Sequence, residues 1–128
     1  AQPKLDAALG AISIHAPSNA QTKHLLNKNL LLLMKPSAYL INTSRGALID
    51  EQALFEVLRD HKIAGAGLDV FETEPLPADS PLRSLDNLVF TMHYAWYSEG
   101  AIQELKETAA LEAYRVLKGE PPQYEVRS

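Results

Sequence analysis

Four short apolar runs in this chain each end in polar residues, and this pattern constrains the fold more than any other feature. The polar residues that close these runs are, in chain order, His15, the segment 42–45 (Asn-Thr-Ser-Arg), Asp69 with Glu74, and His93. In an open α/β sheet the parallel strands are buried and apolar, and ligands bind in the crevice beyond their carboxyl ends. Four separate polar clusters are therefore expected to meet at one edge of a sheet.

The composition is that of a globular domain. The chain has 128 residues, of which 46% are hydrophobic and 22% charged, and a domain of this size buries roughly two thirds of the surface that its unfolded form exposes. Its formal net charge of -4 argues against a nucleic-acid partner, because no basic stripe is available for phosphates. No apolar run approaches the ~20 residues that span a bilayer, which argues against a membrane partner.

Several common kinds of site are excluded by the residues themselves. The chain has no cysteine, so a disulfide framework, a thiolate nucleophile and a cysteine-type zinc site are ruled out, and we expect a cytoplasmic protein. No spacing of His, Asp and Glu predicts a metal site. Residues 1–9 lack the charged and apolar regions of a secretory signal.

Strands and helices are expected to alternate along the chain. Apolar runs bounded by turn residues predict strands over 11–14, 38–41, 63–68 and 88–90. Helical spacing predicts helices over 30–34 and 51–60 and a long last helix, with N-caps at Asn27, Asp50 and Ser98 and a stop at Gly119. This alternation predicts an α/β fold, in which a parallel sheet has flanking helices and right-handed crossovers.

His93 and Glu74 form the first candidate pair. A histidine beside a carboxylate suits proton transfer near neutral pH. The alternative is a capping or surface histidine that precedes the last helix. We expect Glu72 to face solvent, and His24 and His61 to be surface residues.

Arg45 and Asp69 are candidates for binding a ligand. Arg45 follows a strand, where its guanidinium offers two-pronged recognition of a carboxylate; the alternative is a salt bridge with Asp50 or Glu51. Asp69 ends a buried strand, so its carboxylate needs hydrogen-bond donors. Those donors come from a ligand amide, from backbone N–H groups or from an arginine. The alternative is that Asp69 caps the turn that follows it.

Three segments taken together resemble one known family. They are His15-Ala16-Pro17 with Thr22, the run 42–46 (Asn-Thr-Ser-Arg-Gly), and the run 65–75 (Gly-Ala-Gly-Leu-Asp-Val-Phe-Glu-Thr-Glu-Pro). They are similar to the D-2-hydroxyacid dehydrogenase family, in its branch of phosphoglycerate dehydrogenase-like and carboxyl-terminal binding protein-like members. The resemblance implies a partial Rossmann-like fold over residues 1–120, the second half of an NAD-binding domain, followed by an exit tail over 121–128. Thr91-Met92-His93 departs from the family's usual Thr-Pro-His.

The resemblance also implies roles for individual residues. Arg45 would bind the substrate carboxylate and polarise its carbonyl group, His93 would protonate the carbonyl oxygen, and Glu74 would hold His93. Asp69 would contact the nicotinamide side of the cofactor, and Trp96 would line the substrate pocket. The full set of cofactor-binding residues that the resemblance implies is His15, Ala16, Pro17, Thr22, Thr43, Ser44, Arg45, Asp69 and His93.

The implied function is hydride transfer between NAD(H), with NADP(H) not excluded, and a small 2-keto or 2-hydroxy acid. The family's Gly-x-Gly-x-x-Gly turn is not found in these 128 residues, so this chain is expected to be a fragment that is inactive alone and binds NAD weakly. The alternative function is a non-catalytic interaction module, as in the corepressor branch of the family. Pairing of the 11–14 strand with a second copy would give a homodimer.

Overall fold

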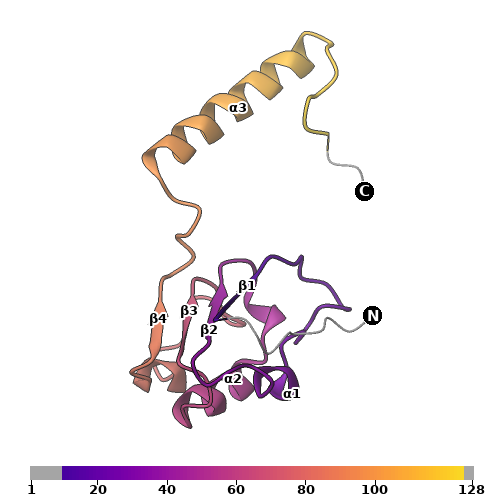
Figure 1. The fold of residues 1–128 in the computed structure, drawn as a ribbon. Helices are drawn as coiled ribbons and strands as arrows, with labels where there is room; N and C mark the ends of the chain where they lie inside the picture. Colours follow the sequence, from indigo (N-terminus) through magenta and orange to yellow (C-terminus); the bar gives the residue numbers. More distant parts are fainter. Residues whose placement is uncertain (1–9, 126–128) are drawn as a thin grey trace. The chain divides into compact units, whose positions relative to one another are not determined.

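The computed structural model describes residues 10–125, so the expectations for residues 1–9 and for the last three residues of the exit tail lie outside the described residues. The chain divides into two compact units, Ala1–Ala95 and Trp96–Ser128. The first unit holds a four-stranded sheet with short helices, and the second holds one long helix (Figure 1). The expected domain end at residue 120 falls within the second unit.

The sheet of the first unit is parallel, with the strand order β1-β2-β3-β4. Its strands are β1 (Ala11–Ile14), β2 (Tyr39–Asn42), β3 (Gly65–Leu68) and β4 (Leu88–Phe90). The register aligns the last residues of β1, β2 and β3, because Ile14 pairs with Asn42 and Asn42 pairs with Leu68. The predicted α/β fold is confirmed, and the polar residues that follow the strands lie at one edge.

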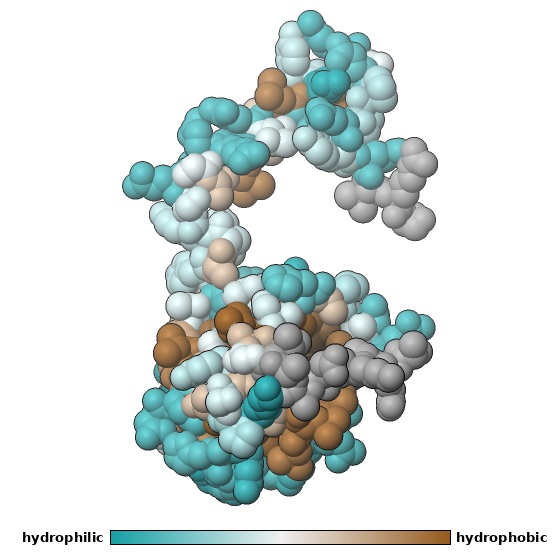
Figure 2. Space-filling view, viewed as in Figure 1, coloured by the Kyte–Doolittle hydropathy of each residue, from teal (hydrophilic) through white to brown (hydrophobic). Residues whose placement is uncertain are grey.

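One face of the sheet forms the core with two helices, α1 (Lys28–Leu31) and α2 (Glu51–Arg59). The strand side chains buried on this face include Ile14, Leu40, Leu68 and Leu88. The opposite face carries the exposed side chains of Tyr39, Ile41 and Val89, and apolar residues are visible on the surface of this unit in Figure 2. The sheet is therefore packed on the side that faces α1 and α2.

The helices begin at the predicted caps. The side chains of Asn27 and Asp50 accept hydrogen bonds from the backbone N–H groups of Leu30 (3.2 Å) and Ala53 (3.0 Å). The predicted bounds of 30–34 for the first helix are wrong: α1 starts directly after its cap, at Lys28, and ends at Leu31. The reason is that a cap side chain binds the N–H group three residues later, so the first helical turn starts immediately after the cap.

Three other predicted bounds also shift. The strand predicted over 38–41 is observed at Tyr39–Asn42, the strand predicted over 63–68 is observed at Gly65–Leu68, and α2 ends at Arg59. Ile63 is fully buried but precedes the paired residues, because burial in a connecting turn satisfies an apolar side chain as well as a strand does. Two short 3-10 helices, η1 (Gly46–Leu48) and η2 (Pro81–Ser84), complete the first unit.

The second unit is built around α3 (Glu99–Leu117). The Ser98 side chain accepts a hydrogen bond from the Ala101 N–H group (3.0 Å), and Gly119 follows the helix with a φ of 78°. No residue of α3 is buried. Within residues 10–125, no helix combines the length and apolar character that crossing a membrane requires.

Candidate active site

The turn that presents Arg45 is built by Asn42, the last residue of β2. The Asn42 amide is fully buried; its Nδ2 donates to the Arg45 carbonyl oxygen (2.9 Å) and its Oδ1 accepts from the Ser44 N–H group (3.0 Å). The Ser44 hydroxyl donates to the Ile14 carbonyl oxygen (2.7 Å), which ties this turn to β1. Because a buried amide needs partners at both ends, Asn42 holds the turn in one conformation. Sequence reasoning missed this role, although an amide at the end of a buried strand was an available signal.

Gly46 brings the loop after β2 against the loop after β3. A Cβ atom at Gly46 would lie 1.9 Å from the carbonyl carbon and 2.0 Å from the carbonyl oxygen of Phe71. Real Cβ atoms do not approach backbone this closely, so a residue without a side chain is required here. The loop that carries Arg45 therefore packs directly on the backbone that leads to Glu74.

The turn that carries His93 is held by Asp69, whose side chain is almost completely buried. The Asp69 carboxylate accepts hydrogen bonds from the Thr91 hydroxyl and from the N–H groups of Tyr94 (2.8 Å) and Ala95 (2.9 Å), and the Asp69 carbonyl oxygen accepts from the His93 N–H group (2.7 Å). These bonds hold His93 in the left-handed region, with a φ of 62°. Asp69 thus has the capping role that the sequence left open, and its carboxylate points into the protein.

His93 and Glu74 form a direct pair. The distance between His93 Nδ1 and Glu74 Oε2 is 2.8 Å, and Glu74 Oε1 accepts a hydrogen bond from the Phe71 N–H group (3.0 Å). The bond with His93 lowers the pKa of Glu74 most, the Phe71 N–H group lowers it further, and the positive charge of Arg45 acts in the same direction. Glu74 is therefore an anion at neutral pH, and its two oxygens are held by the His93 ring and by the Phe71 N–H group.

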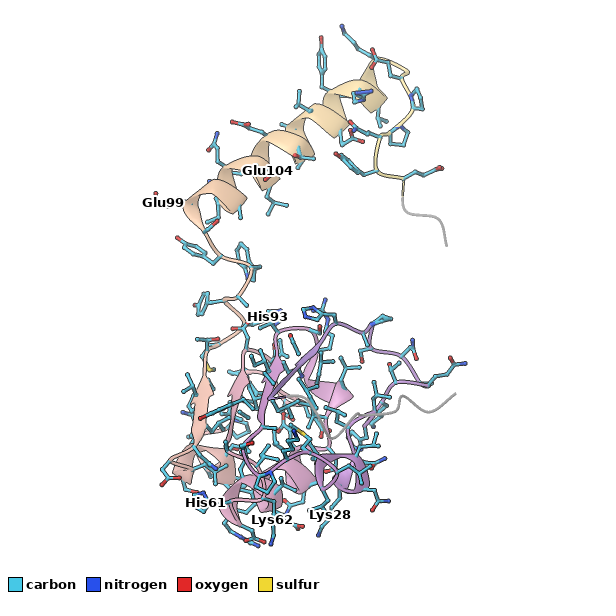
Figure 3. All side chains as sticks on the ribbon, in the orientation of Figure 1. Lys28, His61, Lys62, His93, Glu99 and Glu104 are labelled. Carbon is cyan, nitrogen blue, oxygen red and sulfur yellow. The ribbon has the colours of Figure 1, made fainter. Side chains whose placement is uncertain are left out.

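Two adjacent cavities bring the predicted residues together. Arg45, Glu74 and His93 line one of them, with a volume of about 380 Å³. The second, of about 580 Å³, shares Ser18 and Arg45 with the first and is lined as well by His15, Ala16, Pro17, Thr43 and Ser44. Figure 3 shows His93 at one end of the sheet and His61 at the other.

Three predicted residues line neither cavity: Asp69, which caps the turn of His93, and Thr22 and Trp96. The Thr22 hydroxyl donates to the Pro17 carbonyl oxygen (2.7 Å) and accepts from the Asn19 N–H group (2.9 Å), so it braces the loop that lines the larger cavity. Trp96 belongs to the second unit, where its ring makes an edge-on contact with Tyr97 at 5.7 Å between centroids. Its place in a substrate pocket stays a prediction.

The structure also addresses two expectations from the sequence: a salt bridge between Arg45 and Asp50 or Glu51, and the exposure of Glu72. Within residues 10–125, Arg45 forms no salt bridge with Asp50 or Glu51, and its Nη1 donates to the Ser44 carbonyl oxygen (2.7 Å). Glu72 is exposed, as expected, and its carboxylate also accepts a hydrogen bond from the Glu51 N–H group (3.1 Å). The guanidinium of Arg45 is therefore not committed to a structural ion pair with α2.

Comparison with known proteins identifies the family of this chain. Residues 4–95 match the family described as "D-isomer specific 2-hydroxyacid dehydrogenase, NAD binding domain". The chain belongs to this family. The resemblance seen in the sequence is confirmed, and with it membership of a family of dehydrogenases with an NAD-binding domain; similar solved structures include complexes with NAD+ and with NADPH.

Individual members of the 2-hydroxyacid dehydrogenase family match most of this chain. The glyoxylate reductase of Thermofilum pendens is 49% identical over 111 residues, which are 87% of this chain and 33% of the relative. The solved structure of the TT0316 protein from Thermus thermophilus is 42% identical, with a TM-score of 0.87, and the match covers 92% of this chain and 38% of that one. D-lactate dehydrogenase from Lactobacillus jensenii, solved with NAD+, is 30% identical, with a TM-score of 0.85 and coverage of 93% and 40%. This chain spans about a third of the length of the glyoxylate reductase.

The capping role of Asp69 in this dehydrogenase domain predicts a pH-dependent stability. Burial raises the pKa of Asp69, but the hydrogen bonds from Thr91 and from the Ala95 and Tyr94 N–H groups outweigh it, so the pKa lies below its ordinary 3.8. A carboxyl whose pKa is lower in the folded state stabilises the fold above its unfolded pKa, and this contribution is lost as the pH falls through the folded pKa. Asp69→Asn should therefore lower the free energy of unfolding by about 2–3 kcal/mol at pH 7.

Urea unfolding of the chain at a series of pH values measures this effect. The difference between wild type and Asp69→Asn should shrink as the pH falls below 3.8, the ordinary pKa of the carboxyl. Asp79→Asn, at an exposed position, is the control and should change stability by less than about 0.5 kcal/mol. A loss at Asp69 that is independent of pH would show that the ionised carboxylate does not hold the turn.

Proposed function

We propose that this chain is the part of an NAD-dependent D-2-hydroxyacid dehydrogenase that supplies the proton donor and the carboxylate-binding arginine. The substrate class is a small 2-keto acid, or the corresponding 2-hydroxy acid in the reverse direction. The observation that carries the proposal is the His93–Glu74 pair, 2.8 Å apart, in a cavity that Arg45 also lines. An interaction module has no chemical need for these three groups in one cavity.

Arg45 binds the substrate. Its guanidinium offers parallel N–H donors to the substrate carboxylate and polarises the adjacent keto group. The Asn42 and Gly46 contacts fix the backbone on both sides of Arg45. A fixed backbone reduces the entropy that is lost when the substrate is bound in a reactive orientation.

His93 holds and transfers the proton. Glu74 engages Nδ1 and remains ionised, so the proton for the keto oxygen is assigned to Nε2 of a protonated ring. In the reverse direction the neutral ring takes the proton from the hydroxyl group. The left-handed backbone of His93, held by Asp69, aims the ring toward the cavity.

The residues beside this cavity fit the nicotinamide end of a dinucleotide. The larger cavity lies beyond the carboxyl ends of β1 and β2 and combines the flat apolar surface of Ala16 and Pro17 with hydroxyl groups of Thr43 and Ser44. Apolar contact and hydroxyl groups suit a nicotinamide ring and its ribose, respectively. Bound NADH supplies the hydride in this reaction.

The proposal is tested in a hybrid protein, called the completed enzyme below. In this hybrid, our chain replaces the matching third of the Thermofilum pendens glyoxylate reductase, and the rest of the hybrid is glyoxylate reductase. We expect glyoxylate- or pyruvate-dependent oxidation of NADH, followed by its absorbance. A completed enzyme that folds and binds NADH but reduces no 2-keto acid would instead support a non-catalytic interaction module.

The isolated chain should bind NAD weakly. Affinity for the pyrophosphate of a dinucleotide depends on a glycine-rich turn at a helix N-terminus, and these 128 residues contain no Gly-x-Gly-x-x-Gly motif. We expect a dissociation constant above about 1 mM, equivalent to less than about 4 kcal/mol of binding free energy. Isothermal titration calorimetry with NADH measures it, and micromolar binding would contradict the expectation.

A further inference from the structure

Glu72 joins three segments of the first unit, although it takes no part in the proposed chemistry. Its carboxylate accepts a hydrogen bond from the Glu51 N–H group (3.1 Å), and its own N–H group donates to the Glu51 carboxylate. Glu72 Oε2 also lies 3.1 Å from Nε2 of His24. The start of α2, the loop after β1 and the loop after β3 therefore meet at one side chain.

These contacts bear directly on the catalytic pair. Glu72 is two residues before Glu74 in the chain. Both residues line the cavity, together with Arg45 and His93. Glu72 N also lies 2.5 Å from the position that a Cβ atom at Gly46 would occupy, so the backbone here has little room to shift. The loop that carries Glu74 therefore packs on Gly46 and is hydrogen-bonded to Glu51.

The helix N-terminus and His24 stabilise the carboxylate of Glu72, whereas the nearby carboxylate of Glu51 repels it. The carboxylate of Glu72 lies at the N-terminus of α2, where the N–H groups of the first turn attract an anion. His24 contributes a cation when its ring is protonated. Burial raises the pKa of Glu51, its bond with the Glu72 N–H group lowers it, and the negative charges of Glu72 and Glu74 raise it again. The pKa of Glu51 therefore lies above the ordinary value for a glutamate.

We propose that Glu72 is a positioning residue that fastens the loop after β3 to α2 and to the loop after β1, and thereby holds Glu74 against His93. The proposal rests on the proposed dehydrogenase function for its effect on the reaction. Its effect on the loop can be measured without activity. Glu72 acts through Glu74 and does not touch the reacting atoms.

Hydrogen exchange in the full chain tests the fastening. Glu72→Ala should increase the exchange rate of the Phe71 N–H group, which donates to Glu74, about five- to tenfold, because local opening of the loop becomes easier. Glu72→Gln retains an oxygen that accepts from Glu51, so its rate should stay within about twofold of wild type. Thr73→Ala, at the exposed neighbouring position, is the control and should leave the rate unchanged.

His24→Asn provides a second variant in case Glu72→Ala fails to fold. Asparagine tolerates the left-handed backbone that His24 adopts, with a φ of 51°, while the contact with Glu72 is lost. We expect exchange of the Phe71 N–H group to increase about two- to threefold, since a partly exposed pair contributes little. Rates equal to the Thr73→Ala control in both Glu72→Ala and His24→Asn would overturn the proposal.

Kinetics of the completed enzyme test the consequence for the reaction. Glu72→Ala should lower kcat about fivefold with the KM for the 2-keto acid nearly unchanged, and Glu72→Gln should restore kcat. Faster exchange at Phe71 with an unchanged kcat would overturn the positioning role. If the wild-type completed enzyme reduces no 2-keto acid, the proposed function fails, and the exchange rates alone then decide whether Glu72 fastens the loop.

Discussion

His93→Asn should lower kcat for reduction of a 2-keto acid by about 10²–10⁴-fold in the completed enzyme, while NADH affinity changes little. The reason is that the variant removes the only group in the proposed mechanism that transfers a proton to the keto oxygen. Asparagine suits this position because it adopts the left-handed backbone more readily than most residues, and His93 has a φ of 62°. The loss therefore reports on the imidazole and not on the fold.

His61→Asn is the matched control for this variant. His61 has a φ of 48°, so this substitution also places asparagine in a left-handed backbone conformation. His61, however, lies at the opposite end of the sheet from His93 (Figure 3). We expect kcat to stay within about twofold of wild type. Steady-state kinetics measures kcat, and fluorescence titration measures NADH affinity. An unchanged kcat in His93→Asn would end the catalytic assignment.

Glu74→Gln should show whether the two residues act as one unit. We expect a smaller loss of kcat than for His93→Asn, about 10–10²-fold, because the ring remains but loses the carboxylate that orients it through Nδ1. The double variant should be no worse than His93→Asn alone, because the effects of groups that act together are not additive. Additive losses would mean that Glu74 acts on the substrate independently of His93.

Gly46→Ala should have the largest effect on stability, with a loss of about 4–5 kcal/mol in the free energy of unfolding, or no folding at all. The new Cβ atom would lie 1.9 Å from the Phe71 carbonyl carbon and 2.5 Å from Glu72 N. Both neighbours are backbone atoms in a loop that Glu51 and Glu74 hold by hydrogen bonds, so neither can move at low cost. The loops after β2 and β3 must separate to admit the methyl group.

Gly67→Ala is the control for this substitution. Gly67 lies in β3, and a Cβ atom there would have no heavy atom within 4 Å. Alanine should therefore be tolerated or should stabilise the strand by about 0.5–1 kcal/mol. Urea unfolding followed by circular dichroism compares the two variants. A loss below about 1 kcal/mol for Gly46→Ala would mean that the two loops are not packed as described.

The sequence alone was sufficient for the order of the elements and for the edge at which the site forms. Strands rich in apolar residues and alternating with helices imply parallel pairing, and parallel strands bring their carboxyl ends to one edge, which is why His15, Arg45 and His93 could be grouped before any contact was known. Helix caps are equally local, so Asn27, Asp50 and Ser98 were found correctly. The bounds of α1 and β3 were less accurate, because an apolar residue such as Ile63 is buried equally well in a turn.

The partners of each polar side chain were decided by the tertiary structure. Asp69 and Thr91 are 22 residues apart in the chain, and Glu51 and Glu72 are 21 residues apart. Nothing in the local sequence shows which carboxylate caps a turn, which bonds to the start of α2 and which pairs with His93. That choice depends on which N–H groups the packed loops leave without a partner, and buried polar groups must find one. The sequence determined which residues reach the edge of the sheet, and loop packing around Gly46 determined which partners they contact there.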